Sequence, residues 1–236
     1  MPLLTVASYN IHRCIGRDRQ WHPGRIGRVL QELDADIFGL QEVHSRSGGS
    51  KESYQMKYLA DVMGFEAVAG TTMLKSDAEY GNVLLSRYPV VNVRRLDLSV
   101  PGHEPRGAVD ADIQYGGNII RIIVSHLGLG LIERRRQMKK LLATVETDPS
   151  NLCVLLMDHN EWLPWGPVIR WCNERFCETR RAAKTFPAAF PIFALDRIWV
   201  QPAKALVAVE RYVSAVSKIA SDHLPIRGKI DLDRIT

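Results

Sequence analysis

The sequence predicts a layered α/β protein with mixed β-sheets. Apolar runs rich in valine and isoleucine, typical of buried strands, recur along the chain. These runs cover residues 3–7, 37–40, 83–85, 108–113, 119–124, 152–157, 192–200 and 226–230. Helical patterns separate some of the early runs, whereas strand patterns cluster later, which favours mixed sheets over purely parallel ones.

Three segments have the apolar spacing of an amphipathic helix. Residues 26–33, 58–63 and 138–145 each place apolar side chains on one helical face. Gly64 follows the second segment and can end that helix by adopting the left-handed conformation. The sequence contains no internal repeat, low-complexity tract or long linker. We therefore expect a single domain over residues 1–236.

The composition is that of an ordinary globular protein. The chain has 236 residues, of which 46% are hydrophobic and 24% charged, which excludes disordered and collagen-like classes. The formal net charge of +5 mildly favours an anionic partner. That excess is too small to indicate nucleic-acid binding by itself. No segment indicates an obligate protein partner.

The cysteines and the N-terminus bear on the compartment. Cys14, Cys153, Cys172 and Cys177 form no CxxC pair, and none has histidines at zinc-ligand spacing. The first residues lack the positive charge of a secretory signal, and no apolar stretch is long enough to span a membrane. We therefore expect a soluble protein of a reduced compartment, the cytoplasm.

Polar side chains gather in or beside the ends of several predicted strands. Because a strand carries its last residues to one edge of a sheet, such side chains can converge in a single cleft. Taken singly, such a carboxylate is usually a solvated loop residue or helix cap, and such a histidine a hydrogen-bonded core residue. The set is more informative than its members. It comprises Asn10, Glu42, His126, Asp158, Asn160, Asp196, Asp222 and His223.

Several carboxylates in one cleft indicate a bound cation or raised pKa values, because like charges repel. Hard oxygen ligands without cysteines select Mg²⁺ or Mn²⁺. A cation held by only a few carboxylates keeps open positions for water and for a substrate phosphate. The pattern therefore indicates phosphoryl chemistry.

Short motifs in a fixed order carry a resemblance to a known family. The series resembles the endonuclease/exonuclease/phosphatase superfamily, the deoxyribonuclease-I-like metal-dependent phosphohydrolases, and runs in order over residues 5–230. It comprises Ser8-Tyr9-Asn10-Ile11, Leu40-Gln41-Glu42-Val43, Tyr80-Gly81-Asn82, Ser86-Arg87-Tyr88-Pro89, Arg106-Gly107-Ala108, Ser125-His126-Leu127, Glu133-Arg134 with Gln137, Asp158-His159-Asn160, Leu195-Asp196-Arg197-Ile198 and Ser221-Asp222-His223-Leu224-Pro225. The resemblance implies a four-layer α/β sandwich with two packed mixed β-sheets flanked by helices.

The resemblance also implies a metal site that takes Mg²⁺ or Mn²⁺. Glu42 is similar to the main metal ligand of the family, and Asn10 would lie nearby. Asp222 would help to hold the ion directly or through water. A cation at this position would neutralise charge that builds up on the phosphate in the transition state.

The remaining site residues take catalytic roles by the same resemblance. Asp158 would orient or deprotonate the attacking water, and Asn160 would hold that water or a phosphate oxygen. His223, aligned by Asp196, would donate a hydrogen bond or a proton to the phosphate, and His126 would contact it as well.

The chain departs from the family pattern before the Asp-x-Asn motif. The family usually has glycine there, and this sequence has Met157, so we expect an adjusted strand end. All the polar positions are present, which argues against a catalytically silent binding module.

The motifs do not choose among phosphate esters, so other features are weighed. Arg13 follows the first strand and is a candidate for gripping an anionic substrate. Arg106 is another candidate, although pairing with Glu104 or Asp110 explains it equally well. Because the chain lacks an obvious DNA-binding extension, a general phosphodiesterase or phosphatase is favoured over a nuclease for DNA or RNA, abasic sites included.

Two further features leave the substrate open. Trp162 and Trp165 follow the Asp-x-Asn motif and could stack on a base, dip into lipid or cover the sheet edge. The basic residues 134–140 are more often a solvated helix face than a phosphate-binding site. A lipid-headgroup phosphodiester is a third alternative.

Overall fold

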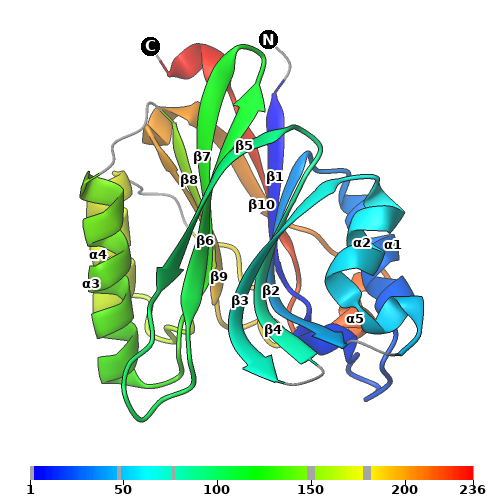
Figure 1. The fold of residues 1–236 in the computed structure, drawn as a ribbon. Helices are drawn as coiled ribbons and strands as arrows, with labels where there is room; N and C mark the ends of the chain where they lie inside the picture. The colour runs from blue at the N-terminus through cyan, green and yellow to red at the C-terminus, as the bar shows by residue number, and fades with distance from the viewer. Residues whose placement is uncertain (1–2, 47–48, 76–77, 148–151, 178–181, 236) are drawn as a thin grey trace.

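The computed structural model describes residues 3–46, 49–75, 78–147, 152–177 and 182–235, and in these ranges it shows two mixed β-sheets (Figure 1). One sheet has the strand order β10 (Leu206–Arg211), β11 (Ile226–Ile230), β1 (Leu4–Asn10), β2 (Ile37–Arg46), β4 (Ala78–Ser86) and β3 (Glu66–Lys75). The other has the order β5 (Val90–Asp97), β6 (Gly107–Tyr115), β7 (Asn118–His126), β8 (Cys153–Asp158) and β9 (Asp196–Gln201).

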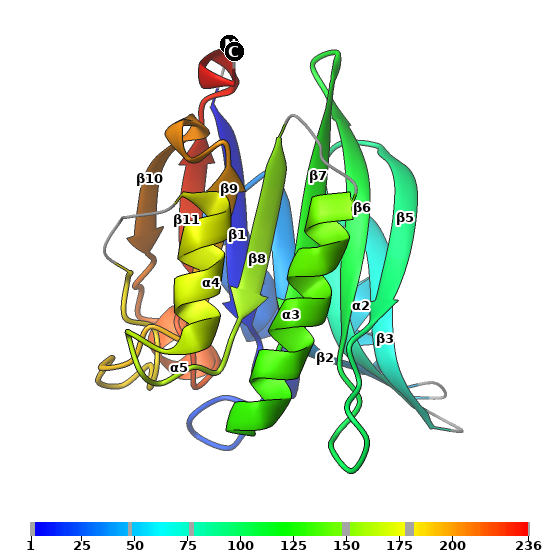
Figure 2. The same ribbon diagram turned by 90° about the vertical axis from the view of Figure 1, so that its left-hand side faces the viewer.

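Helices cover the outer face of each sheet, which gives four layers (Figures 1 and 2). The helices α1 (Pro23–Leu33) and α2 (Gln55–Met63) pack on the six-stranded sheet, with the short α5 (Ser217–Ala220) beside α1. The helices α3 (Leu131–Thr147) and α4 (Pro167–Phe176) pack on the five-stranded sheet. The four-layer sandwich expected from the sequence is therefore confirmed. Within the described ranges, no helix is long and apolar enough to cross a membrane.

The core between the sheets is apolar and closely packed. Leu84 from one sheet and Val154 from the other are fully buried members of it. Gly39 lies where the sheets approach closely, because a Cβ added there would lie only 2.8 Å from the Cβ of Leu156. Real Cβ atoms do not come this close, so glycine permits the approach of β2 to β8 at this point.

The strand directions bring several strand ends together. The strands β1 and β2 are parallel, as are β7 and β8. In Figure 2 these four strands end toward the bottom, while β1 begins at the top of the view. The antiparallel strands β9 and β11 therefore begin where β8 and β1 end. We call this the site end of the sandwich.

A buried ion network stabilises the five-stranded sheet away from the site end. Asp110 is fully buried and accepts two hydrogen bonds from Arg121, at 2.9 and 2.6 Å, and two from Arg94, at 3.1 and 2.9 Å. Arg94 also bonds Asp112, which lowers the pKa of that carboxyl. Asp110 is therefore paired with these arginines, and of the two partners considered for Arg106 the structure shows Glu104 rather than Asp110.

Replacing Asp110 by asparagine is expected to destabilise the fold by about 3 kcal/mol, because it leaves the buried Arg121 without its carboxylate. The matched variant Asp112→Asn removes a more exposed carboxylate and should cost about 1 kcal/mol or less. Urea unfolding measures both changes. Equal effects of the two substitutions would contradict the role given to Asp110.

Candidate active site

The site forms at the site end from residues of both sheets. Each of them lies in a strand or within a few residues of one, so the backbone of the sandwich fixes their positions. They are Asn10 at the end of β1, Glu42 within β2, His126 at the end of β7, Asp158 at the end of β8, Asn160 just beyond it, Asp196 at the start of β9, and Asp222 and His223 before β11.

Asp158 lies at the centre of this group and is fully buried. Asn10 Nδ2 donates to Asp158 Oδ2 at 2.9 Å, and the backbone N–H of Asn160 donates to Oδ1 at 3.1 Å. The same Oδ2 atom lies 3.7 Å from His223 Nε2 and 3.5 Å from His126 Nε2. Asp158 therefore contacts residues contributed by both sheets.

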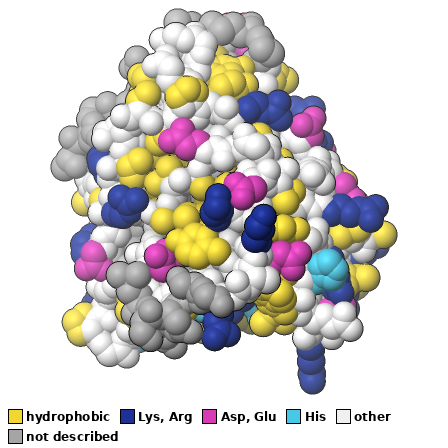
Figure 3. Space-filling view, turned by 45° about the vertical axis from the view of Figure 1, so that its right-hand side comes forward, with side chains coloured by type: hydrophobic (Ala, Val, Ile, Leu, Met, Phe, Trp, Pro, Cys, Tyr) yellow, Lys and Arg dark blue, Asp and Glu magenta, His cyan; other side chains and the backbone are white. Residues whose placement is uncertain are grey.

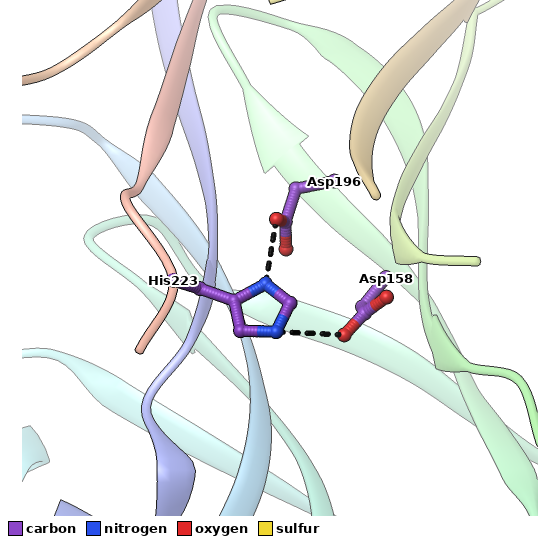
Figure 4. A group of neighbouring side chains, drawn as sticks. All are labelled: Asp158, Asp196 and His223. Atoms are coloured by element: carbon purple, nitrogen blue, oxygen red, sulfur yellow. Dashed lines mark hydrogen bonds and ion pairs between the residues drawn. The ribbon is translucent and has the colours of Figure 1, made fainter. Parts of the chain in front are cut away.

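The ring of His223 lies between two carboxylates, as Figure 4 shows. Its Nδ1 is 2.8 Å from Asp196 Oδ2, and its Nε2 faces Asp158. Thr185 Oγ1 donates to the same oxygen of Asp196 at 2.5 Å. The ring of Phe186 packs against the imidazole with 4.8 Å between centroids. These contacts fix both the position and the orientation of the imidazole.

Burial and charge shift the pKa values of both partners. Burial raises the pKa of Asp158, and Asp196 adds to this while His223 opposes it, so that the pKa is about 7. Burial alone would lower the pKa of His223, but Asp196 and Asp158 outweigh it and raise the pKa to about 10. His223 is therefore protonated at neutral pH, next to a carboxylate that binds a proton more readily than usual.

Glu42 reaches the site through a β-bulge. The pairing of β2 with β4 shifts register between Leu40 and Val43, and Glu42 has a φ of 57°. Non-glycine residues in this left-handed region are strained, and such strain is concentrated at functional sites. Glu42 Oε1 accepts from Asn10 Nδ2 at 3.1 Å, the amide that also donates to Asp158. One amide thus holds two carboxylates side by side.

His126 is held in its neutral form. Asn160 Nδ2 donates to the carbonyl of Leu127 at 2.9 Å and lies 2.9 Å from His126 Nε2, while Arg106 Nη1 lies 3.4 Å from Nδ1 of the same ring. Burial, followed by the charge of Arg106, keeps the pKa of His126 well below its ordinary value. Arg106 is itself mostly buried and pairs with Glu104 at 3.1 Å.

Arg13 and Asp222 lie on the more exposed side of the site. Arg13 Nε is 4.0 Å from Glu42 Oε2, and its guanidinium lies over the ring of Tyr80. Asp222 Oδ1 is 3.7 Å from His12 Nδ1. The side chains of Arg13 and Asp222 are 54% and 38% exposed, so both remain accessible to a substrate.

Met157, which replaces the usual glycine of the family, leaves the strand end regular. It is fully buried in the apolar cluster under α3 and α4, and β8 pairs with both neighbours through it. Its side chain thus packs on the outer face of the sheet. The expected adjustment of this strand end is absent. His159 is also buried, and its Nδ1 accepts from the backbone N–H of Glu161 at 2.9 Å.

The donor set fits a hard divalent cation. Burial and the neighbouring Asp196 disfavour the charged form of Asp158, and such crowding of carboxylates is relieved by a cation. One ligand atom each of Asp158, Asp196 and His223 lies within 4.8 Å of the others. Glu42 offers further carboxylate oxygen close by, held by Asn10. Oxygen ligands of this kind suit Mg²⁺ or Mn²⁺.

Thr185 is a site residue that the sequence did not reveal. It carries no local motif, and the fold brings it to Asp196 from the segment before β9. Ser221 belongs to a recognised motif, but its role needed the structure. Its hydroxyl donates to the carbonyl of Asn10 at 2.8 Å and accepts from the backbone N–H of His223 at 3.2 Å. It thereby links β1 to the segment that carries the histidine.

A four-layer sandwich with carboxylates, a paired histidine and amides at one end is the architecture of a family whose members are metal-dependent phosphoester hydrolases. A family model described as the C-terminal nuclease-like domain of PGAP2IP matches residues 2–158. The chain is also 30% identical over 245 residues to uncharacterized protein YbhP of Escherichia coli K12, covering 96% of both proteins. The chain belongs to the endonuclease/exonuclease/phosphatase family.

Solved structures show the same fold. The endonuclease/exonuclease/phosphatase from Bacteroides vulgatus has a TM-score of 0.79 at 18% identity. The match covers 98% of this chain and 100% of that chain. The mannosyl-6-phosphatase Bt3783 from Bacteroides thetaiotaomicron has a TM-score of 0.69 at 20% identity, covering 95% of this chain and 98% of that one. These structural similarities establish the fold. They do not identify the substrate, which has to be inferred from the site of this protein.

Proposed function

We propose that this protein hydrolyses a phosphate ester by attack of water on phosphorus, with a divalent metal ion as cofactor. The observation that carries the proposal is the position of Asp158 between Asn10 and Glu42 on one side and His223 with Asp196 on the other. The adjacency of a candidate base, a candidate cation site and a histidine with a raised pKa supports the proposal.

Five residues of the site have separate roles in the proposed hydrolysis. Asp158 accepts a proton from the attacking water as the water oxygen bonds to phosphorus, and the ester oxygen leaves. His223 donates a hydrogen bond or proton to the phosphate, where negative charge builds up. Asp196 positions the ring. The side-chain oxygen of Asn160 accepts a hydrogen bond from the attacking water, and His126, which lies 2.9 Å from the Asn160 amide, contacts the phosphate.

Glu42, Asn10 and Asp222 are the residues that we propose to hold the metal ion. Both ring nitrogens of His223 already face carboxylates. Its pKa is raised, and a protonated imidazole has no free lone pair with which to coordinate a metal ion. The oxygen-rich side around Glu42 therefore suits Mg²⁺ or Mn²⁺ better than the group of Asp158, Asp196 and His223. When bound, the ion supplies Lewis-acid stabilisation of the charge on the phosphate.

Replacing Glu42 by glutamine is expected to weaken Mg²⁺ binding by about tenfold or more, because a charged ligand is lost. The matched variant Glu174→Gln changes an exposed carboxylate on α4 and should bind Mg²⁺ like the wild type. Isothermal titration calorimetry with Mg²⁺ measures both. Unchanged affinity in Glu42→Gln would overturn the proposed metal site, and no binding to the wild type would favour a silent binding module.

Cleavage of DNA or RNA is a second candidate function. It is supported by the turn after β1, where Arg13, Arg17 and Arg19 are all exposed. Such a cationic turn beside the site fits a polyanionic substrate. Assays on plasmid DNA, abasic duplex and single-stranded RNA, each with and without chelator, separate this activity from hydrolysis of small or lipid phosphate esters.

A further inference from the structure

Exposed large apolar side chains concentrate at the site end. Among the described residues, three such side chains lie elsewhere, namely Leu3, Val91 and Ile119. The others lie in the loops that follow β1, β7 and β8, in the first turn of α3, in the segment before β9, and between β10 and β11. They are Trp21, Leu129, Leu131, Ile132, Trp162, Leu163, Trp165, Phe190, Ile192, Val213 and Ile219.

Five of these side chains form an apolar rim beside the site, defined as Trp162, Leu163, Trp165, Phe190 and Ile192. Trp165 is 74% exposed and Phe190 is 76% exposed, so neither contributes much to the core. The rim connects directly to the site, because the ring of Trp162 packs against Phe186 at 6.1 Å between centroids. Phe186 in turn packs against His223. Exposed apolar groups gathered in this way mark an interaction surface.

Positive charge flanks this surface on the side of α3 and α4. A groove of about 340 Å³ between the two helices is lined by Ile132, Pro167, Trp171 and four basic residues, with no carboxylate in its lining. The basic residues are Arg135, Arg136, Lys139 and Arg170. Both helices begin at the site end, as Figure 2 shows, so the groove adjoins the loops that carry the exposed apolar side chains.

The face of the molecule shown in Figure 3 differs from this arrangement. The side of the molecule in Figure 3 carries positive and negative side chains interspersed, with hydrophobic ones scattered among them. Such a mixed surface is typical of a face that remains in water. The groove between α3 and α4, which has four basic residues and no carboxylate in its lining, differs from this face.

We propose that the site end docks on an anionic phospholipid bilayer and thereby presents the site to the phosphate ester of a lipid headgroup. The substrate part rests on the proposed function. Aromatic and aliphatic side chains enter the boundary between headgroups and acyl chains, while the basic groove attracts anionic lipid. A single-stranded nucleic acid would use aromatic stacking but would gain little from Leu129, Leu131 or Leu163.

The docking surface is tested by vesicle co-sedimentation with the full chain. Vesicles of phosphatidylcholine alone and of phosphatidylcholine with phosphatidylglycerol serve as probes. The double variant Trp165→Ala, Phe190→Ala should bind the anionic vesicles at least about tenfold more weakly than the wild type, because two large apolar side chains no longer insert. The matched control Val91→Ala, Ile119→Ala changes exposed residues away from the site end and should bind normally.

Further measurements separate the outcomes. Turnover of the soluble ester bis(p-nitrophenyl) phosphate should be unchanged in the double variant, because Trp165 and Phe190 are exposed and the ring contacts to His223 run through Trp162 and Phe186 instead. Absence of wild-type binding to anionic vesicles would overturn the docking proposal even where hydrolysis is observed. Vesicle binding without hydrolysis of either the soluble ester or the vesicle lipid would refute the proposed function and the lipid substrate. The same result would support the docking surface. Loss of oligonucleotide binding with unchanged vesicle binding in the double variant would also overturn the proposal.

Discussion

Replacing Asp158 by asparagine is expected to reduce turnover of a phosphodiester by about three orders of magnitude, equivalent to about 4 kcal/mol in activation free energy. The substitution removes the carboxylate that accepts the proton of the attacking water. It keeps the size of the side chain and an oxygen that can accept one of the two hydrogen bonds from Asn10 and Asn160. Steady-state kinetics with Mg²⁺ measures the loss.

Thermal melting distinguishes this chemical effect from misfolding. Burial raises the pKa of Asp158 to about 7, so above the pKa of the unfolded chain the charged carboxylate lowers folding stability. We therefore expect Asp158→Asn to fold and to melt close to the wild type, because removal of the buried charge offsets the hydrogen bond that the amide cannot accept. The control Asp61→Asn changes an exposed carboxylate on α2 and should leave both rate and stability unchanged. A wild-type rate in Asp158→Asn would refute the role of Asp158.

Replacing His223 by glutamine is expected to reduce turnover by about 100-fold to 10,000-fold, because the phosphate loses a charged donor. Asp196→Asn should cost less, about tenfold to 100-fold, since it leaves the ring in place but weakens its orientation and its positive charge. The double variant should be little slower than His223→Gln alone, because Asp196 acts through the ring.

The turnover rates of His223→Gln, Asp196→Asn and the double variant together test whether Asp196 acts through His223. Fully additive losses in the double variant would show that Asp196 acts independently of His223. A rate in His223→Gln equal to that of the wild type would remove the histidine from the reaction. Circular dichroism of each variant checks that the buried network still folds.

The sequence predicted the central strands and the edge strand β9, but not the other three edge strands. The strands β3, β5 and β10 lie at sheet edges; β3 and β5 mix polar with apolar residues, and the apolar part of β10 is only four residues long, Leu206 to Val209. In β5 every side chain is exposed or half-buried, because an edge strand needs fewer buried side chains. The apolar run at residues 192–200 predicts a strand that begins four residues before β9 does. Its first residues, including the exposed Ile192, form the segment before β9 rather than a strand.

The members of the site were predictable, but their contacts were not. Motifs indicated Glu42, Asp158 and His223, because a polar residue at a strand end is visible in the sequence. No pattern could show that Asn10 bonds two carboxylates, since the pairing depends on the β-bulge at Glu42. Thr185 could not be predicted either, because its segment meets Asp196 only in the folded chain.

Hydrolysis in ¹⁸O-labelled water tests the central claim most directly. With Mg²⁺ present, we expect bis(p-nitrophenyl) phosphate to yield a phosphate product that carries the ¹⁸O label, because water attacks phosphorus. With chelator present, we expect no product. Label in the released alcohol, or turnover that persists unchanged in chelator, would contradict a metal-dependent attack of water on phosphorus.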